Sequence, residues 1–533
     1  MKTKIGAVAL AATFAMGMAL AATADAKEFR YATGQDILGL DPHINNHGGT
    51  NAMKVQIYEP LVHRHPDLSL HPALATDWQQ TSPTVWRFNL RKGVKFHGGE
   101  DFTADDVIFS WKRTSQPESE MAYTVRTVKD IRKIDDHTIE IETTGPDPVL
   151  LQNLTLFIIM DEGWTTKNGG EKVVRGAQVN TFVNLNANGT GPFRLVERAP
   201  DTRTVLEANA AWWGKGANST NITKATFTPI ANAATRVSAL LSGDLDLMYH
   251  VPQQDVQRLE QTQGVRVQAG GTARVIFLGF DHFRDELLDM PGTGKNPLKD
   301  VRVRKALYQA IDINQIRRAV MRNSSTPNGL MIAPGVGGFQ EDMNQRFPFD
   351  AEASKKLLAE AGYPNGFPLT LNCPNNRYVN DEAICSAIIP MFARIGIQAK
   401  LNAMPMNQHF NTAGPAGGYK SSMYMLGWTP ANMDLSNPLV EILAFDEKVG
   451  LVGANNWGRY NNPKLNDLTK QVLVETDQTK RNQLARDAMK VIVDDVAYIP
   501  LHLEPQVFGV RDTVADFQMR RHEDVDLRFV KMK

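Results

Sequence analysis

Two pairs of histidines have spacings at which side chains can share a transition-metal ion: His43 with His47, and His63 with His65. The first spacing suits a helix and the second an extended segment. However, Pro42 and Gly48 predict a loop around the first pair, while Arg64 and Pro66 predict a solvated turn around the second. We therefore interpret all four as ordinary polar histidines and expect no bound metal.

Motifs with a defined catalytic geometry are absent from the sequence. It contains no P-loop, GxSxG nucleophile elbow, dinucleotide-binding GxGxxG or HExxH zinc helix. The best nucleophile that can be assembled is Ser421-Ser422 with a distant histidine, which is a weak basis for a secreted hydrolase. The sequence therefore favours a binding protein without a cofactor over an enzyme, and a hydrolase is the alternative.

The two cysteines of the chain, Cys373 and Cys385, lie in one short segment. In an exported protein such a pair predicts a local disulfide. A metal site is the alternative, but the segment has neither a CxxC pair nor a nearby histidine.

Tryptophans are the side chains best suited to stack on a ligand. For the adjacent Trp212 and Trp213 we expect core packing, with one of the two pointing inward. Trp428 differs because it follows an apolar strand and precedes the loop residues Thr429 and Asn432. Ends of strands commonly meet ligands, so Trp428 is a candidate for ligand contact, with core packing as the alternative.

The first 26 residues have the organisation of a secretory signal peptide. Lys2 and Lys4 precede an apolar run that starts at Ile5, and the small-residue triplet 24–26 (ADA) follows it. No cysteine follows the run, so we do not expect a lipid anchor. We predict a periplasmic protein that begins at Lys27 after cleavage.

Length and charge restrict the function further. The 533 residues exceed what one hydrophobic core usually supports, so two or three lobes are expected. The 58 basic and 58 acidic residues balance, which argues against a nucleic-acid partner.

Patterns of apolar residues predict a mixed α/β chain. Alternation predicts a strand at 28–32 and a β-hairpin in which 86–90 pairs with 94–96, and Thr103 with Asp106 predicts a capped helix after it. Residues 138–143 predict a strand and 193–206 a strand pair. Helical periodicity begins at Asp300. Beyond it helices are expected at 351–361, 381–395 and 480–494, and strands at 369–372, 398–401 and 422–426.

Seven segments together resemble the peptide- and nickel-binding class of extracytoplasmic solute-binding proteins of ABC importers. They are 40–43 (LDPH), 57–61 (IYEPL), 88–99 (FNLRKGVKFHGG), 189–193 (GTGPF), 298–307 (LKDVRVRKAL), 310–312 (AID) and 496–501 (VAYIPL). The resemblance covers essentially the whole predicted mature chain, and the order of the segments makes it specific.

The resemblance implies an α/β, bilobal periplasmic-binding-protein fold with an additional third domain and a ligand cleft between the lobes. It implies a discontinuous lobe I from 27–57, 190–275 and 505–533, an extra domain at 58–189 packed on lobe I, and lobe II at 276–504. It also implies capture by hinge closure and delivery to a membrane permease.

Ligand contacts are carried over from the family only at matching positions. Arg377 is similar in place to an arginine that grips the carboxylate of a bound dipeptide, and its planar guanidinium suits that role. The alternatives are a solvated loop arginine or an ion pair with Asp381. The aspartate that neutralises a peptide's amino terminus is replaced by Ala431, while Asp434 matches a second acidic position and could instead cap a helix near Leu435.

The family therefore implies a small, peptide-like ligand, and we expect the protein to act as a monomer. Because this aspartate is missing, the resemblance does not imply that the ligand must have a free amino terminus. A nickel chelate, haem, a glycan or an opine-like anion remain alternatives because related folds can host all of them.

Overall fold

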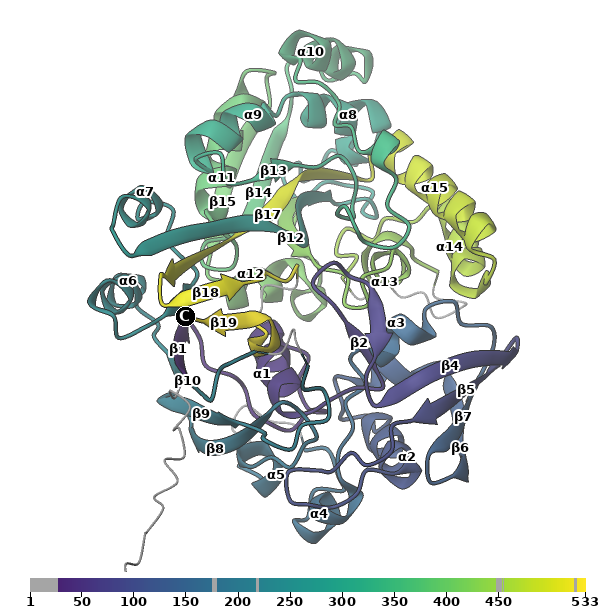
Figure 1. Cartoon of the computed structure of the whole chain (residues 1–533). Coiled ribbons are helices and arrows are strands. Elements are labelled where there is room, and N and C mark those ends of the chain that lie inside the picture. The colour runs from purple at the N-terminus through teal and green to yellow at the C-terminus, as the bar shows by residue number, and fades with distance from the viewer. Residues whose placement is uncertain (1–26, 175–179, 217–219, 447–452, 454, 522–524) are drawn as a thin grey trace, which may run out of the picture.

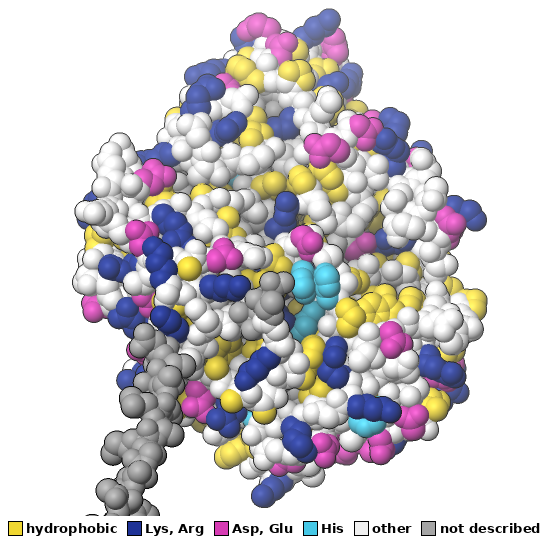
Figure 2. Space-filling view, viewed as in Figure 1, with side chains coloured by type: hydrophobic (Ala, Val, Ile, Leu, Met, Phe, Trp, Pro, Cys, Tyr) yellow, Lys and Arg dark blue, Asp and Glu magenta, His cyan; other side chains and the backbone are white. Residues whose placement is uncertain are grey.

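The computed structural model describes residues 27–174, 180–216, 220–446, 453, 455–521 and 525–533. The predicted signal peptide, residues 1–26, lies outside the described residues. Within that described part, no helix combines the length and apolar character needed to cross a membrane. Acidic and basic side chains are interspersed on the face shown in Figure 2.

An 11-stranded sheet runs through the whole molecule. Its order is β15-β14-β16-β12-β17-β11-β1-β10-β9-β8, and β13 pairs with β17. The bounds are β15 (Gln398–Met404), β14 (Pro368–Pro374), β16 (Met423–Trp428), β12 (Val265–Phe280), β17 (Tyr498–Arg511), β11 (Leu247–Tyr249), β1 (Glu28–Thr33), β10 (Lys224–Pro229), β9 (Arg203–Ala208), β8 (Phe193–Ala199) and β13 (Thr326–Pro327).

The long antiparallel strands β12 and β17 connect the two halves of the molecule (Figure 1). Their register shifts between Gly271 and Val275. On one side of this shift β12 pairs with β16, and on the other side β17 pairs with β11. Two strands that pass from one half to the other therefore form the centre of the fold.

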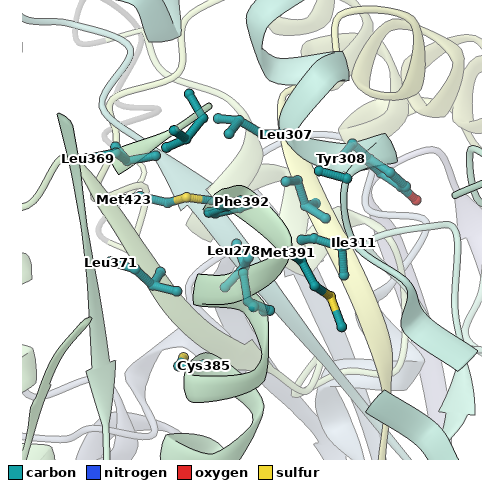
Figure 3. Close-up of a cluster of buried hydrophobic side chains, with 14 of the residues drawn as sticks. Leu278, Leu307, Tyr308, Ile311, Leu369, Leu371, Cys385, Met391, Phe392 and Met423 are labelled. Atoms are coloured by element: carbon teal, nitrogen blue, oxygen red, sulfur yellow. The ribbon is translucent and has the colours of Figure 1, made fainter. Parts of the chain in front are cut away.

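Both faces of the sheet are buried in the half that contains β14, β15 and β16. Alternate residues of β12 enter different cores: Ile276 and Leu278 pack in one cluster, and Val275 and Phe277 pack in another. The first cluster, drawn in Figure 3, also receives side chains from α8 (Val301–Gln309) and α11 (Asp381–Ala393). The two-residue period of a strand explains how one apolar strand supplies two cores.

Local signals account for several helices of this half. The Asp300 side chain accepts a hydrogen bond from the Arg302 amide at the start of α8. The other long helices are α10 (Ala351–Glu360), α14 (Pro463–Val474) and α15 (Gln478–Asp494).

A separate four-stranded sheet, ordered β4-β5-β7-β6, covers a core of its own in the other half. Its strands are β4 (Ala75–Ser82), β5 (Val85–Leu90), β6 (Val128–Asp135) and β7 (Thr138–Thr143). The helix α2 (Ala104–Thr114) packs on this sheet, and Thr103 and Asp106 form the expected capping box.

The hairpin predicted between 86–90 and 94–96 is wrong. β5 pairs with β4 on one edge and with β7 on the other, so no edge of β5 is left for residues 94–96. Gly93 has a positive φ of 73°, and the chain turns away from the sheet there. Val94 and Phe96 are still buried, but as loop residues in the core beneath.

The remaining elements are short or lie at the periphery. They are α1 (Gly48–Ile57), α3 (Leu150–Leu154), α4 (Glu162–Lys167), α5 (Phe182–Leu185), α6 (Ala233–Ser242), α7 (Val256–Glu260), α9 (Ile313–Gln315), α12 (Met406–Ala413), α13 (Ser436–Pro438), β2 (Val62–Arg64), β3 (Leu70–Pro72), β18 (Val514–Phe517) and β19 (Val530–Met532).

Candidate ligand-binding site

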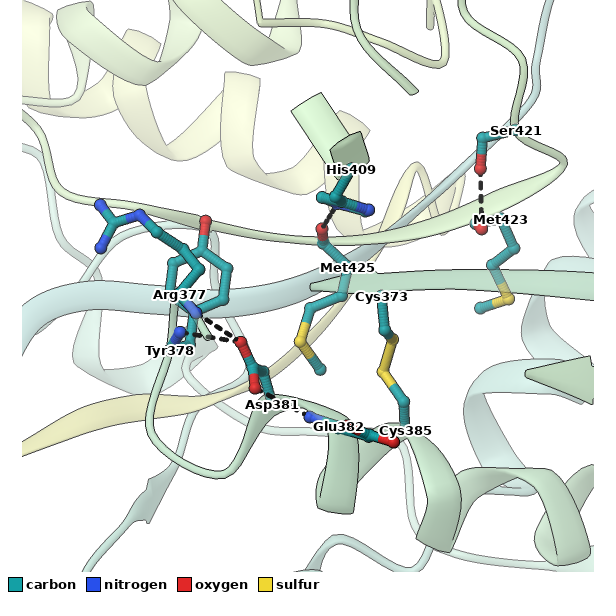
Figure 4. Close-up of a disulfide and its surroundings, with 10 residues drawn as sticks. All are labelled: Cys373, Arg377, Tyr378, Asp381, Glu382, Cys385, His409, Ser421, Met423 and Met425. Carbon is teal, nitrogen blue, oxygen red and sulfur yellow. Dashed lines mark hydrogen bonds between the residues drawn. A yellow bond between two sulfur atoms is a disulfide. The ribbon is translucent and has the colours of Figure 1, made fainter. Parts of the chain in front are cut away.

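A disulfide fixes the ends of the loop that carries Arg377. Cys373 in β14 and Cys385 in α11 are both fully buried, and their Cα atoms are 6.7 Å apart. That separation is within the range that a disulfide spans. Figure 4 shows the bond with Arg377 on the loop between the two cysteines. The loop therefore has little freedom to move relative to the sheet.

Hydrogen bonds to Asp381 shape this loop further. The Asp381 Oδ2 atom accepts bonds from the backbone amides of Arg377, at 2.8 Å, and Tyr378, at 3.0 Å. The guanidinium of Arg377 instead lies over the Tyr378 ring, 5.1 Å from its centre (Figure 4). Arg377 forms no ion pair with any residue that the structure describes, so the alternative pairing with the Asp381 carboxylate is wrong.

The same loop is attached to the two strands that connect the halves. Glu504 in β17 accepts a hydrogen bond from the Val379 amide, at 2.9 Å, and one from Arg274 in β12, at 2.6 Å. Burial raises the pKa of Glu504, but Arg274 and the amide outweigh it and hold that pKa below its ordinary value. An ionised Glu504 thus links the Arg377 loop to both connecting strands.

Trp428 and Thr429 lie at the same end of the sheet. Trp428 pairs with Val275 at the register shift of β12, and the Tyr378 hydroxyl accepts a bond from the Gly427 amide at 2.8 Å. The indole nitrogen of half-buried Trp428 donates to the Asn437 side chain at 2.9 Å.

Buried polar atoms without a partner occur both beside Trp428 and at α1. Burial lowers the pKa of His47, at the start of α1, and the positive charge of Arg377 lowers it further. His47 Nδ1, Asn51 Oδ1 and Thr429 Oγ1 are buried without a hydrogen-bond partner among the described residues. Such atoms are costly unless a ligand or water satisfies them.

Two of the predicted site residues are occupied by internal bonds. Asn432 accepts from the Asp434 amide at 3.1 Å and donates to Ser436 at 3.3 Å. Asp434 forms a buried, two-point ion pair with Arg481, at 2.6 and 2.9 Å, and accepts from the Ser436 amide at 2.8 Å. The bond from the Ser436 amide matches the alternative role predicted for Asp434, which was to cap a helix near Leu435.

The structure thus brings Arg377, Trp428 and Thr429 together with residues that sequence reasoning missed. Arg274 and Glu504 gave no local signal, because they are 230 positions apart in sequence and meet only in the sheet. His47 lies outside any helix, as predicted, but the predicted loop is too long, because Gly48 and Gly49 already belong to α1.

The other histidine interpretation also needs correction. His63 lies in β2 rather than on a solvated turn, and it is 7% exposed. It is 3.5 Å from the Glu59 carboxylate and contacts Arg528, a partner far along the chain. The rings of His65 and His71 stack at 3.6 Å.

Trp212 and Trp213 are both half-buried, and Trp213 packs against the core of the four-stranded sheet, as expected for one of the two. Their indole nitrogens donate to the two oxygens of the buried Glu59 carboxylate, at 3.1 and 2.8 Å. A buried carboxylate is costly without hydrogen-bond donors, and the two bonds to Glu59 fix the orientation of both indole rings.

Neither of the two serines considered for a hydrolase, Ser421 and Ser422, is bonded to a histidine among the described residues, and Ser422 Oγ is buried without a partner there. The Ser421 hydroxyl donates to the Met423 carbonyl at 2.9 Å, and His409 Nε2 bonds the Met425 carbonyl at 2.8 Å (Figure 4). Each of these side chains therefore binds the backbone of β16.

Comparisons with known proteins agree with this architecture. Residues 69–448 match the family described as bacterial extracellular solute-binding proteins, family 5. Heme-binding protein A of Haemophilus influenzae is 26% identical over 502 residues, which cover 89% of this chain and 86% of that protein. The dipeptide-binding protein of Escherichia coli is 26% identical over 538 residues, which cover 95% and 96%.

A solved structure shows the same fold. The periplasmic binding protein DppA from Helicobacter pylori, in complex with peptide STSA, aligns with a TM-score of 0.75 and 23% identity over 95% of this chain and 98% of that one. The predicted bilobal α/β fold is confirmed. The family match covers well over half of the chain, and the protein therefore belongs to the family 5 bacterial extracellular solute-binding proteins.

Proposed function

We propose that the protein is the periplasmic binding component of an ABC importer and that it carries a short peptide or peptide-like anion. The observation that carries this proposal is Arg377, a cation without an acidic partner among the described residues, held on the disulfide-closed loop at the end of β14. A planar guanidinium in that position can donate two charge-assisted bonds to a ligand carboxylate.

Hinge closure is proposed to occur about β12 and β17. We assign lobe I to 27–57, 190–275 and 505–533, the extra domain to 58–189, and lobe II to 276–504. The chain then passes between the lobes twice, once in β12 at the register shift and once in β17 directly after Glu504. Because Glu504 bonds both Arg274 and the Val379 amide, a change in the connecting strands would be transmitted to the Arg377 loop.

The amine end of the ligand is proposed to be less strictly recognised. Ala431 supplies no carboxylate, and the Asp434 carboxylate is held by Arg481. A ligand with a blocked or absent amino terminus would therefore bind with little loss of affinity. Peptide binding by the E. coli and H. pylori relatives supports a peptide-like ligand in general.

Calorimetric titration with tri-alanine and N-acetyl-tri-alanine tests this proposal. The wild type should bind both with similar affinity, whereas Ala431→Asp should favour the free amine and disfavour the acetylated form, because an unpaired buried carboxylate is costly. A strong wild-type preference for the free amine would contradict the proposed role of Ala431. Native mass spectrometry of freshly purified protein would identify a retained natural ligand.

Export and delivery complete the proposal. We propose that cleavage after residue 26 releases the mature protein into the periplasm. There it acts as a monomer and docks on a membrane permease. N-terminal sequencing of the periplasmic protein should begin at Lys27, and a mature protein that retains Met1 would contradict export by this route.

A further inference from the structure

A second pocket lies in lobe II, away from the proposed ligand cleft. It has a volume of about 410 Å³, and His282, Phe283, Arg304, Phe445, Arg459 and Asp495 contribute to its lining. The part of β12 that pairs with β16 runs from Val275, beside Trp428, to Phe280, beside Met423, and His282 follows that far end. The five steps from Val275 to Phe280 span about 17 Å, so the end of β12 beside the pocket is that far from the Trp428 end.

The only carboxylate lining this pocket, among the described residues, is already neutralised. Asp495 Oδ1 accepts from Arg304 at 2.6 Å, and Asp495 Oδ2 accepts from the Tyr460 hydroxyl at 2.8 Å. Arg304 also donates to the carbonyls of Leu298 and Val496, at 2.9 and 3.1 Å. This network fixes the floor of the pocket and leaves no acid for another cation.

Arg459 is the cation that remains. Its guanidinium carbon is 5.4 Å from the centre of the Phe283 ring, 4.8 Å from that of Tyr419 and 5.5 Å from that of Phe445. Its Nε is buried without a hydrogen-bond partner, and Arg459 forms no ion pair with a described residue. The side chain is therefore surrounded by aromatic rings but lacks an anion.

The backbone holds Arg459 in a position that arginine rarely adopts. Its φ is 50°, in the left-handed region, which is sterically unfavourable for a residue with a side chain. Asn456 maintains this conformation because its side chain bonds both the amide and the carbonyl of Tyr460, at 2.9 and 2.8 Å. Strain that the surroundings enforce is typical of functional positions.

We propose that this pocket is a second binding site, specific for a small aromatic carboxylate. The carboxylate would bind the free edge of the Arg459 guanidinium, and the ring would pack against Phe283 and Phe445. Lys299 and Arg304 also line the pocket, each already paired with a carboxylate, so the unpaired positive charge there is that of Arg459. The volume lies in the lower part of the range for small-ligand pockets and suits a molecule with one ring.

Fluorine NMR with 4-fluorobenzoate tests the proposal on the full mature protein. The wild type should bind the probe, and Arg459→Gln should weaken binding about tenfold or more, since a charge-assisted pair is lost. Benzylamine, which has the ring but the opposite charge, should not compete. Absence of wild-type binding, or equal binding by Arg459→Gln, would overturn the proposal.

Three further variants make the result specific. Asn461→Asp adds a negative charge at the pocket wall and keeps the acceptor for Asn466, 2.9 Å away, so it should weaken probe binding even if Arg459→Gln folds poorly. Arg394→Gln removes a positive charge from the exposed end of α11 and should change nothing. Arg377→Gln separates the two sites: loss of the probe in this variant alone would place it in the main cleft and refute the second site.

Discussion

Two arginines of this protein have opposite surroundings. Arg113 is 1% exposed and donates to both oxygens of Asp41, at 2.8 and 2.5 Å, to the Gly170 carbonyl at 2.6 Å, and contacts His43 Nδ1 at 3.0 Å. Arg377 lies against one aromatic ring and has no described acidic partner. A guanidinium enclosed in the interior must be satisfied by the fold, whereas one at the cleft can remain available to a ligand.

Removing the partner of Arg113 is expected to have the largest effect on stability. Asp41→Asn leaves a buried guanidinium without its anion, so the free energy of unfolding should fall by roughly 3–5 kcal/mol. Urea unfolding measures it. The matched control is Asp101→Asn, which breaks the Lys95–Asp101 pair at 2.7 Å, where the side chains are 55% and 68% exposed.

The control should change stability by only about 0–1 kcal/mol, because solvent screens an exposed pair. If both variants lost the same free energy, burial would not distinguish the two kinds of ion pair, and the contrast between Arg113 and Arg377 would lose its basis.

Loss of the disulfide is expected to rank second. Cys373 and Cys385 are 12 positions apart, and opening a loop of that size should cost roughly 3 kcal/mol by the chain-entropy model. The variant Cys373→Ser/Cys385→Ser should also bind ligand more weakly, since the Arg377 loop loses an anchor. Unchanged ligand affinity in a destabilised variant would show that Asp381 and Glu504 position the loop without the disulfide.

A buried histidine should give a smaller, pH-dependent effect. Burial lowers the pKa of His409 to about 4, below the ordinary value of about 6.5 for an unfolded chain. Between these two pKa values, His409 is therefore protonated in the unfolded state and neutral in the folded state. The stability that His409 contributes is present above pH 6.5 and is lost as the pH falls from 6.5 towards 4.

His409→Gln removes this titration and can keep the bond to the Met425 carbonyl. Between pH 7 and pH 5 the wild type should lose about 2 kcal/mol relative to the variant. Parallel stability curves in urea over that range would contradict the low pKa of His409.

The sequence predicted the features that depend on neighbouring residues. The capping box of Thr103 and Asp106 and the apolar strand before Trp428 are local, and the structure contains both elements. The failed hairpin depended on which strands occupy the edges of β5, and the burial of His63 depends on Arg528, 465 positions away. Likewise, Glu504 reaches the Val379 amide across 125 positions. Such contacts follow from the whole fold and leave no trace in a local pattern.

Arg377→Gln tests the central claim most directly, and it should have the smallest effect on stability, within about 0.5 kcal/mol. The measurement is a calorimetric cycle of wild type and variant with N-acetyl-tri-alanine and its C-terminal amide. The wild type should prefer the acid, and the variant should lose about 2–5 kcal/mol of affinity for the acid while binding acid and amide equally. An Arg377→Gln protein that keeps the wild-type preference for the acid would contradict the assignment of Arg377 to the ligand carboxylate.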